Sequence, residues 1–197
     1  SKRLKLPAVA YIQNLRWKKY FKRFMVLNEA VRERFIAQGV KEEKVAVVGD
    51  LAKDGIKLSM SARETFNYWG LDSKHLIISL LPGSRPKEIG YITPFFLEVA
   101  ELIREKFPSS QFLLILSPFI SRKKLNSLGE GELSKTFWGV KAKLKRENGQ
   151  RRLIAKSGLE VLLVEEKRYQ AISVSDLIIT IPGTNTLEST YLETPMI

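Results

Sequence analysis

HLIISLLPGSR at residues 75–85 and SDLIITIPGTNTLE at residues 175–188 decide the fold of this chain. Each stretch places a continuous apolar run before a glycine turn and small polar residues. A continuous run, rather than an alternating one, is typical of a strand that is buried on both faces of a parallel sheet. Helices must then cover both faces, so the two stretches predict an α/β fold with two strand–turn–helix junctions.

Strands and helices alternate along the rest of the chain. We expect strands at residues 9–12, 24–27, 45–48, 75–81, 111–116, 159–164 and 176–181, and another that begins at 194–197. We expect helices at residues 17–23, 29–38, 62–69, 167–174 and 184–192 and within 87–107, with Asn28 and Ser61 as N-caps of the second and third. This alternation predicts a Rossmann-like, doubly wound parallel sheet, which looks incomplete because it ends on a fresh strand.

Three segments leave this pattern open. Pro94 lies within the helix expected at 87–107, so that helix either begins at Pro94 after a single turn or kinks there. Residues 50–59 lack a clear period, and we interpret them as a connection. Residues 126–152 are polar, basic and contain glycine, which fits an irregular excursion or a short helix with a hairpin.

The charge balance is strongly basic. The chain has 33 lysines and arginines against 21 acidic residues, a net charge of +12. That balance favours polyanionic partners, namely nucleic acid, an anionic membrane surface or phosphorylated small molecules. Residues 1–28 combine lysines, arginines and aromatics without any acid. The segment 16–24 therefore suits an anionic membrane surface, and it fits equally well a solvated helix face whose aromatics belong to the core.

Composition also bears on location and on metals. No apolar stretch approaches the roughly 18 residues of a membrane-spanning helix, so we expect a cytoplasmic protein. The chain has no cysteine and a single histidine, His75. Disulfides, thiolate sites and imidazole clusters are thereby excluded, and we expect neither a metal centre nor a cofactor.

The first junction supplies a candidate anion site. Gly83 lets backbone N–H groups approach a phosphate, Ser84 adds a hydroxyl donor, and Arg85 offers a planar fork for phosphate oxygens. Glu88 follows three residues after Arg85, where its carboxylate can orient the fork. Glycine also ends many strands for backbone reasons alone, so this turn by itself is a weak signal.

The second junction has a similar arrangement. Small residues crowd the entrance of its helix, where they would cap the helix or grip an anion: Gly183, Thr184, Asn185 and Thr186. Glu188 lies on the first turn, where a carboxylate accepts ribose hydroxyls or simply complements the helix dipole. Ligands of parallel sheets collect at the carboxyl ends of the strands. We therefore expect both junctions to converge on one cleft and to bind one phosphorylated ligand.

The same residues resemble a known family. LLPGSRPKEIG at 80–90, followed by PFFLEVAELI at 94–103, looks like the corresponding stretch of lipid-A-disaccharide synthases. SDLIITIPGTNTLESTYLETPMI at 175–197 resembles the second signature of that family, and residues 18–49 are similar to the end of its first domain. Two signatures in the same order make the resemblance specific, and together these stretches cover most of the chain outside 120–160.

The resemblance implies an inverting glycosyltransferase of the GT-B type, with two Rossmann-like lobes. Residues 1–50 would be the tail of the N-terminal, acceptor-side lobe, and residues 51–197 a donor lobe truncated at its C-terminus. The implied reaction moves an acylated glucosamine from a UDP-sugar to a lipid-linked or phosphosugar acceptor and releases UDP without a metal. Gly83, Ser84 and Arg85 would face the diphosphate, and residues 184–186 would help to bind it. Glu188 would accept hydrogen bonds from the ribose hydroxyls.

The implied partners are the UDP-sugar and a lipid or glycolipid acceptor, at the inner face of the plasma membrane and without nucleic acid. The chain departs from the family pattern at residues 11–17 and 49–51, which lie toward the acceptor side, so a different lipid or glycan acceptor stays open. The family's catalytic base belongs to the missing part of the first lobe. We therefore name no catalytic residue and expect this stretch alone to be inactive. Two alternatives remain: an isomerase like the UDP-sugar 2-epimerases, and a non-catalytic, basic nucleic-acid-binding domain.

Overall fold

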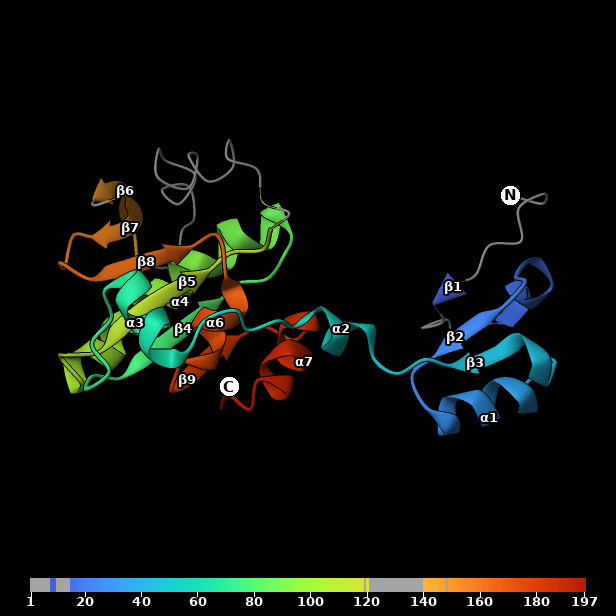
Figure 1. Ribbon diagram of the computed structural model, residues 1–197. Helices are drawn as coiled ribbons and strands as arrows, with labels where there is room; N and C mark the ends of the chain where they lie inside the picture. The colour runs from blue at the N-terminus through green and yellow to red at the C-terminus, as the bar shows by residue number, and fades with distance from the viewer. Residues whose placement is uncertain (1–7, 10–14, 119, 121–139, 148) are drawn as a thin grey trace. The chain divides into compact units, whose positions relative to one another are not determined.

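The computed structural model describes residues 8–9, 15–118, 120, 140–147 and 149–197 of the chain (Figure 1). The chain falls into two compact units, Ser1–Gly55 and Ile56–Ile197. Each unit has its own sheet and its own apolar core. The two units are therefore described separately.

The first unit contains a small parallel sheet. Strands β1 (Ala8–Val9), β2 (Phe24–Val26) and β3 (Val45–Val47) lie in that order, and helix α1 (Glu29–Ala37) connects β2 to β3. The core is a single buried cluster of Phe24, Val26, Phe35, Val40 and Val45. The strand–helix–strand pattern predicted for residues 24–48 is thus confirmed.

Local signals fix the ends of α1. The Asn28 side chain accepts a hydrogen bond from the backbone N–H of Val31 at 3.0 Å, which is the predicted N-cap.

Two predictions for the first unit are corrected. The helix expected at 17–23 is instead a 3-10 helix, Leu15–Tyr20, and residues 50–59 include a short helix, α2 (Leu51–Gly55).

The burial of the aromatic residues near this 3-10 helix distinguishes in part between the two interpretations of segment 16–24, a membrane-binding surface and a solvated helix face with aromatics in the core. Phe24 is only 1% exposed and packs edge-on against Phe35, while Phe21 packs against the same core. The neighbouring cations stay exposed: Lys18, Lys19, Lys22 and Arg23. For Phe21 and Phe24 the core alternative is therefore correct, and the exposed cations remain available to an anionic surface.

The second unit is built on a six-stranded sheet in the order β6-β7-β8-β5-β4-β9. Its strands are β4 (Ile77–Leu81), β5 (Gln111–Ile115), β6 (Ala142–Glu147), β7 (Gln150–Ala155), β8 (Glu160–Val164) and β9 (Leu177–Thr180). Strands β8, β5, β4 and β9 are parallel, as predicted. Strands β6 and β7 form an antiparallel hairpin at one edge, so the sheet is mixed rather than wholly parallel. Of the two conformations left open for 126–152, the described part is this hairpin.

Helices cover both faces of this sheet, as Figure 1 shows. They are α3 (Ala62–Trp69), α4 (Pro86–Lys106), α6 (Arg168–Ser173) and α7 (Thr184–Tyr191). Alternate residues of β4 enter two different cores: Ile78 and Leu80 pack with α4, and Ile77 and Leu81 pack with the α3 and α6 side. A strand with two buried faces has to be apolar throughout, which explains the continuous run that predicted it.

Pro94 does not start or interrupt α4. The helix runs unbroken from Pro86 to Lys106, so Pro86 occupies the first helical position and Pro94 lies inside. The possibility of a helix that begins at Pro94 is therefore wrong. The backbone N–H of Val140 donates to the carbonyl of Pro94 at 3.0 Å, and Phe96, Leu97 and nearby apolar residues anchor the helix on the sheet.

The last residues of the chain extend the sheet at the other edge. Ile178 of β9 pairs with Met196 in parallel, and the N–H of Ile197 donates to the carbonyl of Ile178 at 2.9 Å. The fresh strand predicted at 194–197 is therefore present as the start of a ladder. The predicted Rossmann-like α/β fold is confirmed, with the antiparallel hairpin as the addition that the sequence left open.

Candidate functional site

The two junctions lie side by side because their strands are neighbours. Strands β4 and β9 pair in parallel, with Leu81 opposite Thr180, so both chains leave the sheet at the same edge. The turn after β4 leads into α4, and the turn after β9 leads into α7. The convergence predicted for Arg85 and the entrance near Thr184 is thus confirmed.

Both junctions line one cavity of about 280 Å³. We call it the junction cavity. Of the predicted site residues it contains Gly83, Ser84, Arg85, Glu88, Gly183, Thr184, Asn185 and Glu188. Thr186 is not among the lining residues. Its hydroxyl donates to the carbonyl of Gly183 at 2.7 Å and so closes the first turn of α7.

Glu88 holds the Arg85 side chain, as their spacing indicated. One carboxylate oxygen of Glu88 accepts from Arg85 Nη1 at 2.8 Å, and the other accepts from the Arg85 backbone N–H at 3.1 Å. The Glu88 carboxylate thus caps α4 and at the same time orients the guanidinium of Arg85. The Arg85 side chain remains 81% exposed, which leaves most of its donors free to face a ligand.

This cap sets the protonation behaviour of Glu88. The hydrogen bond from the Arg85 backbone N–H, followed by the hydrogen bond and charge of the Arg85 side chain, lowers the pKa of Glu88 below its ordinary 4.5. The contribution of Glu88 to stability is therefore fully present above the unfolded-state pKa, and it is lost as the pH falls through the lower folded-state pKa.

We expect Glu88→Gln to destabilise the protein near neutral pH, and we expect the difference from wild type to vanish in acid. The reason is that protonation removes the same charge as the substitution. Urea unfolding between about pH 3 and pH 7 measures this difference. Glu64→Gln is the matched control for this pH dependence. Hydrogen bonds from Ser61 at the start of α3 lower the pKa of Glu64 in a similar way, and this cap lies away from the junction cavity. A difference for Glu88→Gln that stays constant with pH would contradict the assignment.

On the other wall of the cavity Glu188 is buried and forms an ion pair with Arg168. It is 5% exposed, and its Oε1 accepts from Arg168 Nη1 at 2.9 Å and from the Tyr169 hydroxyl at 3.1 Å. Burial, followed by the Glu188 charge, raises the pKa of Tyr169 above its ordinary 10.0, so its hydroxyl stays protonated at neutral pH. Glu188 is the fifth residue of α7, whose first turn holds no acid, so the expectation that Glu188 lies on the first turn is wrong.

The sequence did not single out Arg168 and Ser117, which also line the junction cavity. Both follow parallel strands of the same sheet, Ser117 after β5 and Arg168 after β8. The rule that ligands collect at the carboxyl ends of strands therefore applied to them as well. Neither follows a glycine turn, which was the signal used to choose candidates.

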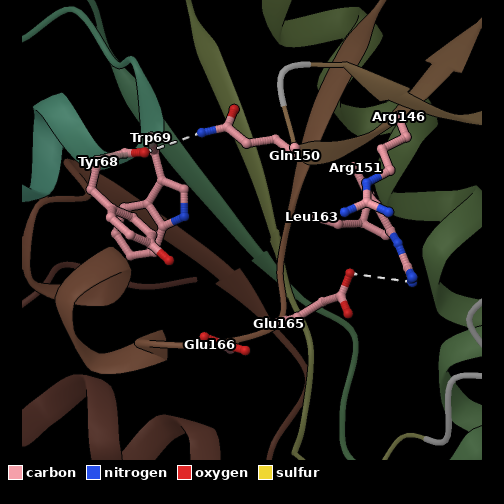
Figure 2. Close-up of a pocket in the computed structure, with 9 residues that line it drawn as sticks. Tyr68, Trp69, Arg146, Gln150, Arg151, Leu163, Glu165 and Glu166 are labelled. Atoms are coloured by element: carbon pink, nitrogen blue, oxygen red, sulfur yellow. Dashed lines mark hydrogen bonds and ion pairs between the residues drawn. The ribbon is translucent and has the colours of Figure 1, made fainter.

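A second cavity, of about 440 Å³, lies at the β6–β7 hairpin and contains none of the predicted residues. Figure 2 shows Arg151 facing Glu165 and the Gln150 amide reaching the backbone of Tyr68. Arg151 Nη1 lies 3.4 Å from Glu165 Oε1, and Gln150 Nε2 donates to the Tyr68 carbonyl at 3.1 Å. Its lining mixes arginines with acids that can neutralise them, so it points to no ligand of one charge. The junction cavity is the candidate site.

The described ranges hold neither a metal-binding cluster nor a membrane-spanning helix. There, no three or more acidic or histidine side chains gather in a way that could hold a metal ion. Within the same residues, every helix is too short or too polar to traverse a bilayer.

The fold and the cavity together define a class. That class is a Rossmann-like α/β unit in which two glycine turns meet at the carboxyl edge of the sheet, where parallel sheets collect ligands. Comparison with solved structures agrees with this fold. A UDP-GlcNAc 2-epimerase from Neisseria meningitidis, solved with UDP-GlcNAc bound, matches with a TM-score of 0.53 at 14% identity and covers 91% of this chain and 45% of its own. The UDP-GlcNAc 2-epimerase from Methanocaldococcus jannaschii matches with a TM-score of 0.52 at 17% identity, over 91% of this chain and 46% of its own.

Sequence comparison is more specific. Residues 41–136 match the family model described as lipid-A-disaccharide synthetase. The lipid-A-disaccharide synthase of Geobacter sulfurreducens is 32% identical over 153 residues, which are 78% of this chain and 33% of the relative. That of Pasteurella multocida is 26% identical over 174 residues, which are 88% of this chain and 37% of the relative. The chain is therefore a relative of the lipid-A-disaccharide synthases, and it spans about a third of the length of these curated relatives.

Proposed function

We propose that the unit Ile56–Ile197 binds the UDP-sugar donor of a glycosyltransferase of the lipid-A-disaccharide synthase type, with the diphosphate in the junction cavity. One observation carries the proposal. Two glycine turns from distant parts of the sequence, at Gly83 and Gly183, line a single cavity together with Arg85. The sequence relatives are named lipid-A-disaccharide synthases, and a UDP-sugar donor is what the resemblance to that family implies.

The geometry supports specific roles in this reaction. As the bond from the sugar to the diphosphate breaks, negative charge develops on the diphosphate, and fixed donors aimed at that charge lower the barrier. Arg85, oriented by Glu88, provides such a donor from one wall, and Ser84 lines the same cavity. Thr184 and Asn185 face the same space from the first turn of α7. Glu188, on the opposite wall, is the candidate acceptor for ribose hydroxyls.

The wider assignment is part of the same proposal. Residues 1–50 belong to the acceptor-side lobe and residues 51–197 to the donor lobe, and the complete enzyme transfers an acylated glucosamine to a lipid-linked or phosphosugar acceptor. The exposed cations Lys18, Lys19, Lys22 and Arg23 would face anionic headgroups through charge alone. Binding to anionic vesicles that weakens with salt is what this last point requires.

Calorimetric titration of the chain with UDP, UDP-GlcNAc and an acylated UDP-glucosamine tests the donor site. We expect heat of binding with all three, and competition among them, because they share the uridine diphosphate group that the cavity would hold. Uridine is the control ligand, since it lacks the diphosphate, and it is expected to bind more weakly. A folded sample that gives no heat with any diphosphate would overturn the proposal.

The two alternatives predict different results. An isomerase like the epimerases would convert UDP-sugar without an acceptor, whereas a transferase turns over only when an acceptor is present. The epimerase reading is supported by fold likeness alone, at 14% and 17% identity. A nucleic-acid-binding domain would bind generic duplex with a steep dependence on salt.

A further inference from the structure

The cavity at the β6–β7 hairpin lies at the same edge of the sheet as the junction cavity. Strand β7 runs antiparallel to β8, with Arg152 opposite Leu162, so the tip of the hairpin lies beside the carboxyl end of β8. Ligands of parallel sheets collect at that edge. We call this space of about 440 Å³ the hairpin cavity.

Two arginines of the hairpin cavity face each other across the strands. Arg146 of β6 and Arg151 of β7 are register partners, so their side chains lie on one face of the hairpin. Like charges directly opposite each other destabilise a sheet, and an anion bound between them removes that cost. Arg151 already has a counter-ion, because its Nη1 lies 3.4 Å from Glu165 Oε1. Arg146 is exposed and has no ion pair or hydrogen bond with any described residue.

The acidic side of the hairpin cavity has a matching surplus of charge. Glu165 and Glu166 follow β8 directly, and Glu165 pairs with Arg151. Glu166 is exposed and, within the described ranges, forms neither an ion pair nor a hydrogen bond. Figure 2 shows the Arg151–Glu165 pair between Arg146 and Glu166. Once the inner pair has formed, one guanidinium and one carboxylate therefore remain, on either side of that pair.

The hairpin cavity also has an apolar wall. Tyr68 and Trp69 of α3 line it, with their ring centroids 5.1 Å apart, and so does Leu163 of β8. Trp69 is only 4% exposed, whereas Tyr68 is 46% exposed. Tyr68 thus offers ring surface that the methylene groups of a ligand can cover.

We propose that the hairpin cavity binds a small zwitterion of the aminoalkyl phosphate class, with the phosphate at Arg146 and the ammonium group at Glu166. A ligand that carries both charges satisfies both unpaired groups, which a ligand of one charge does not. Phosphate is favoured over carboxylate because two facing guanidinium groups offer donors to several oxygens of one tetrahedral group. An ion pair separates the two partners, so the ligand's charges must be separated by a short chain. This site is separate from the junction cavity and does not depend on the function proposed above.

NMR titration of the isotope-labelled chain with 2-aminoethyl phosphate tests this site. We expect the signals of the Trp69 indole and the Gly149 amide to shift, because both residues line the hairpin cavity, and the signals of Gly83 and Gly183 to stay unchanged. Ethyl phosphate lacks the ammonium group and ethylamine lacks the phosphate, so each is expected to bind at least about tenfold more weakly. The carboxylate analogue 4-aminobutyrate is expected to bind with intermediate affinity.

Two variants separate the ends of the ligand. In Arg146→Gln we expect the affinity for 2-aminoethyl phosphate to fall to that of ethylamine, and in Glu166→Gln to that of ethyl phosphate. Both side chains are exposed, so neither variant is expected to lower the melting temperature, and Arg146→Gln also removes the like-charge opposition to Arg151. Lys145→Gln is the matched control. Lys145 is an exposed cation of the same strand outside the hairpin cavity, and its loss is expected to leave the affinity unchanged.

The same aminoethyl phosphate group also occurs as a lipid headgroup. Sedimentation with phosphatidylcholine vesicles, with and without phosphatidylethanolamine, distinguishes the two sources. If only vesicles that contain phosphatidylethanolamine pellet the wild-type chain, and they fail to pellet Arg146→Gln, the headgroup is the ligand. If the wild-type chain stays in the supernatant with both while it binds 2-aminoethyl phosphate, the ligand is the free molecule.

Three results would overturn the zwitterion site. The first is that 2-aminoethyl phosphate shifts no signal of the hairpin cavity. The second is that ethyl phosphate binds as tightly as 2-aminoethyl phosphate, and the third is that Lys145→Gln weakens binding as much as Arg146→Gln. Either of the last two would mean that the basic hairpin attracts anions in general. Because UDP binding at the junction cavity is measured separately, each proposal can fail without the other.

Discussion

Arg85→Ala is expected to weaken UDP binding by about 10- to 100-fold while it leaves uridine binding nearly unchanged. Charge-assisted hydrogen bonds from a guanidinium to phosphate oxygens contribute on the order of 1.5–3 kcal/mol each, and tenfold in affinity corresponds to about 1.4 kcal/mol. The side chain is 81% exposed, so its removal should hardly change the stability of the fold. Calorimetry with UDP and uridine, beside thermal unfolding, measures both quantities.

Two controls make this result specific to the fork. Arg85→Lys keeps the charge but loses the planar pair of donors, and we expect an affinity between those of wild type and Arg85→Ala. Arg63→Ala removes one positive charge from the exposed face of α3, outside the junction cavity, and it should leave UDP affinity unchanged. Equal losses in Arg85→Ala and Arg63→Ala would mean that general charge attraction, rather than the cavity, binds the nucleotide.

Gly83→Ala is expected both to destabilise the protein, by at least about 1 kcal/mol, and to abolish the preference for UDP over uridine. Gly83 has φ of +102°, a conformation that residues with a side chain rarely adopt. A Cβ atom there would stand 2.7 Å from Glu88 Oε2 and 2.9 Å from Ile181 Cδ1. Glu88 would have to move away, and its bonds to the Arg85 backbone and fork would break.

A second glycine separates the two causes. Gly158 also has a positive φ, +78°, but a Cβ atom at that position meets nothing within 4 Å. Gly158→Ala therefore carries the backbone strain without displacing a side chain. We expect it to lower the melting temperature and to leave UDP binding intact. If Gly83→Ala bound UDP like wild type, Glu88 would not be the residue that organises Arg85.

Much of the fold could be predicted because both faces of the central strands are buried. The apolar run of β4 and the cap at Ser61 are local signals, and both were confirmed. Local signals failed where tertiary contacts decide the outcome. For Pro94 the sequence left open a helix that begins there or one that kinks there, and α4 instead begins at Pro86 and continues past Pro94 while its apolar residues pack on the sheet. Residues 15–20 form a 3-10 helix, where periodicity alone indicated an α-helix over 17–23.

The site was predictable where sequence neighbours act together. Glu88 was matched to Arg85 because the two lie three residues apart in one helix turn, and the contact is present. Arg168 was not predicted as a site residue, because its partner Glu188 lies 20 residues away in another helix. The sequence around Arg168 does not indicate that pairing. Arg168 follows two acids and a lysine, which are typical of an ordinary charged loop. Only the order of strands in the sheet brings the two side chains together.

The pairing of β4 with β9 has a consequence for the timing of assembly. Ile78 and Leu177 are register partners, although they lie 99 positions apart along the chain. Contacts between such distant segments form late, because a long loop must close before they gain anything. A growing polypeptide therefore exposes Arg85 and its glycine turn well before the opposite wall exists. The proposed ligand site is therefore complete only after β9 has paired with β4.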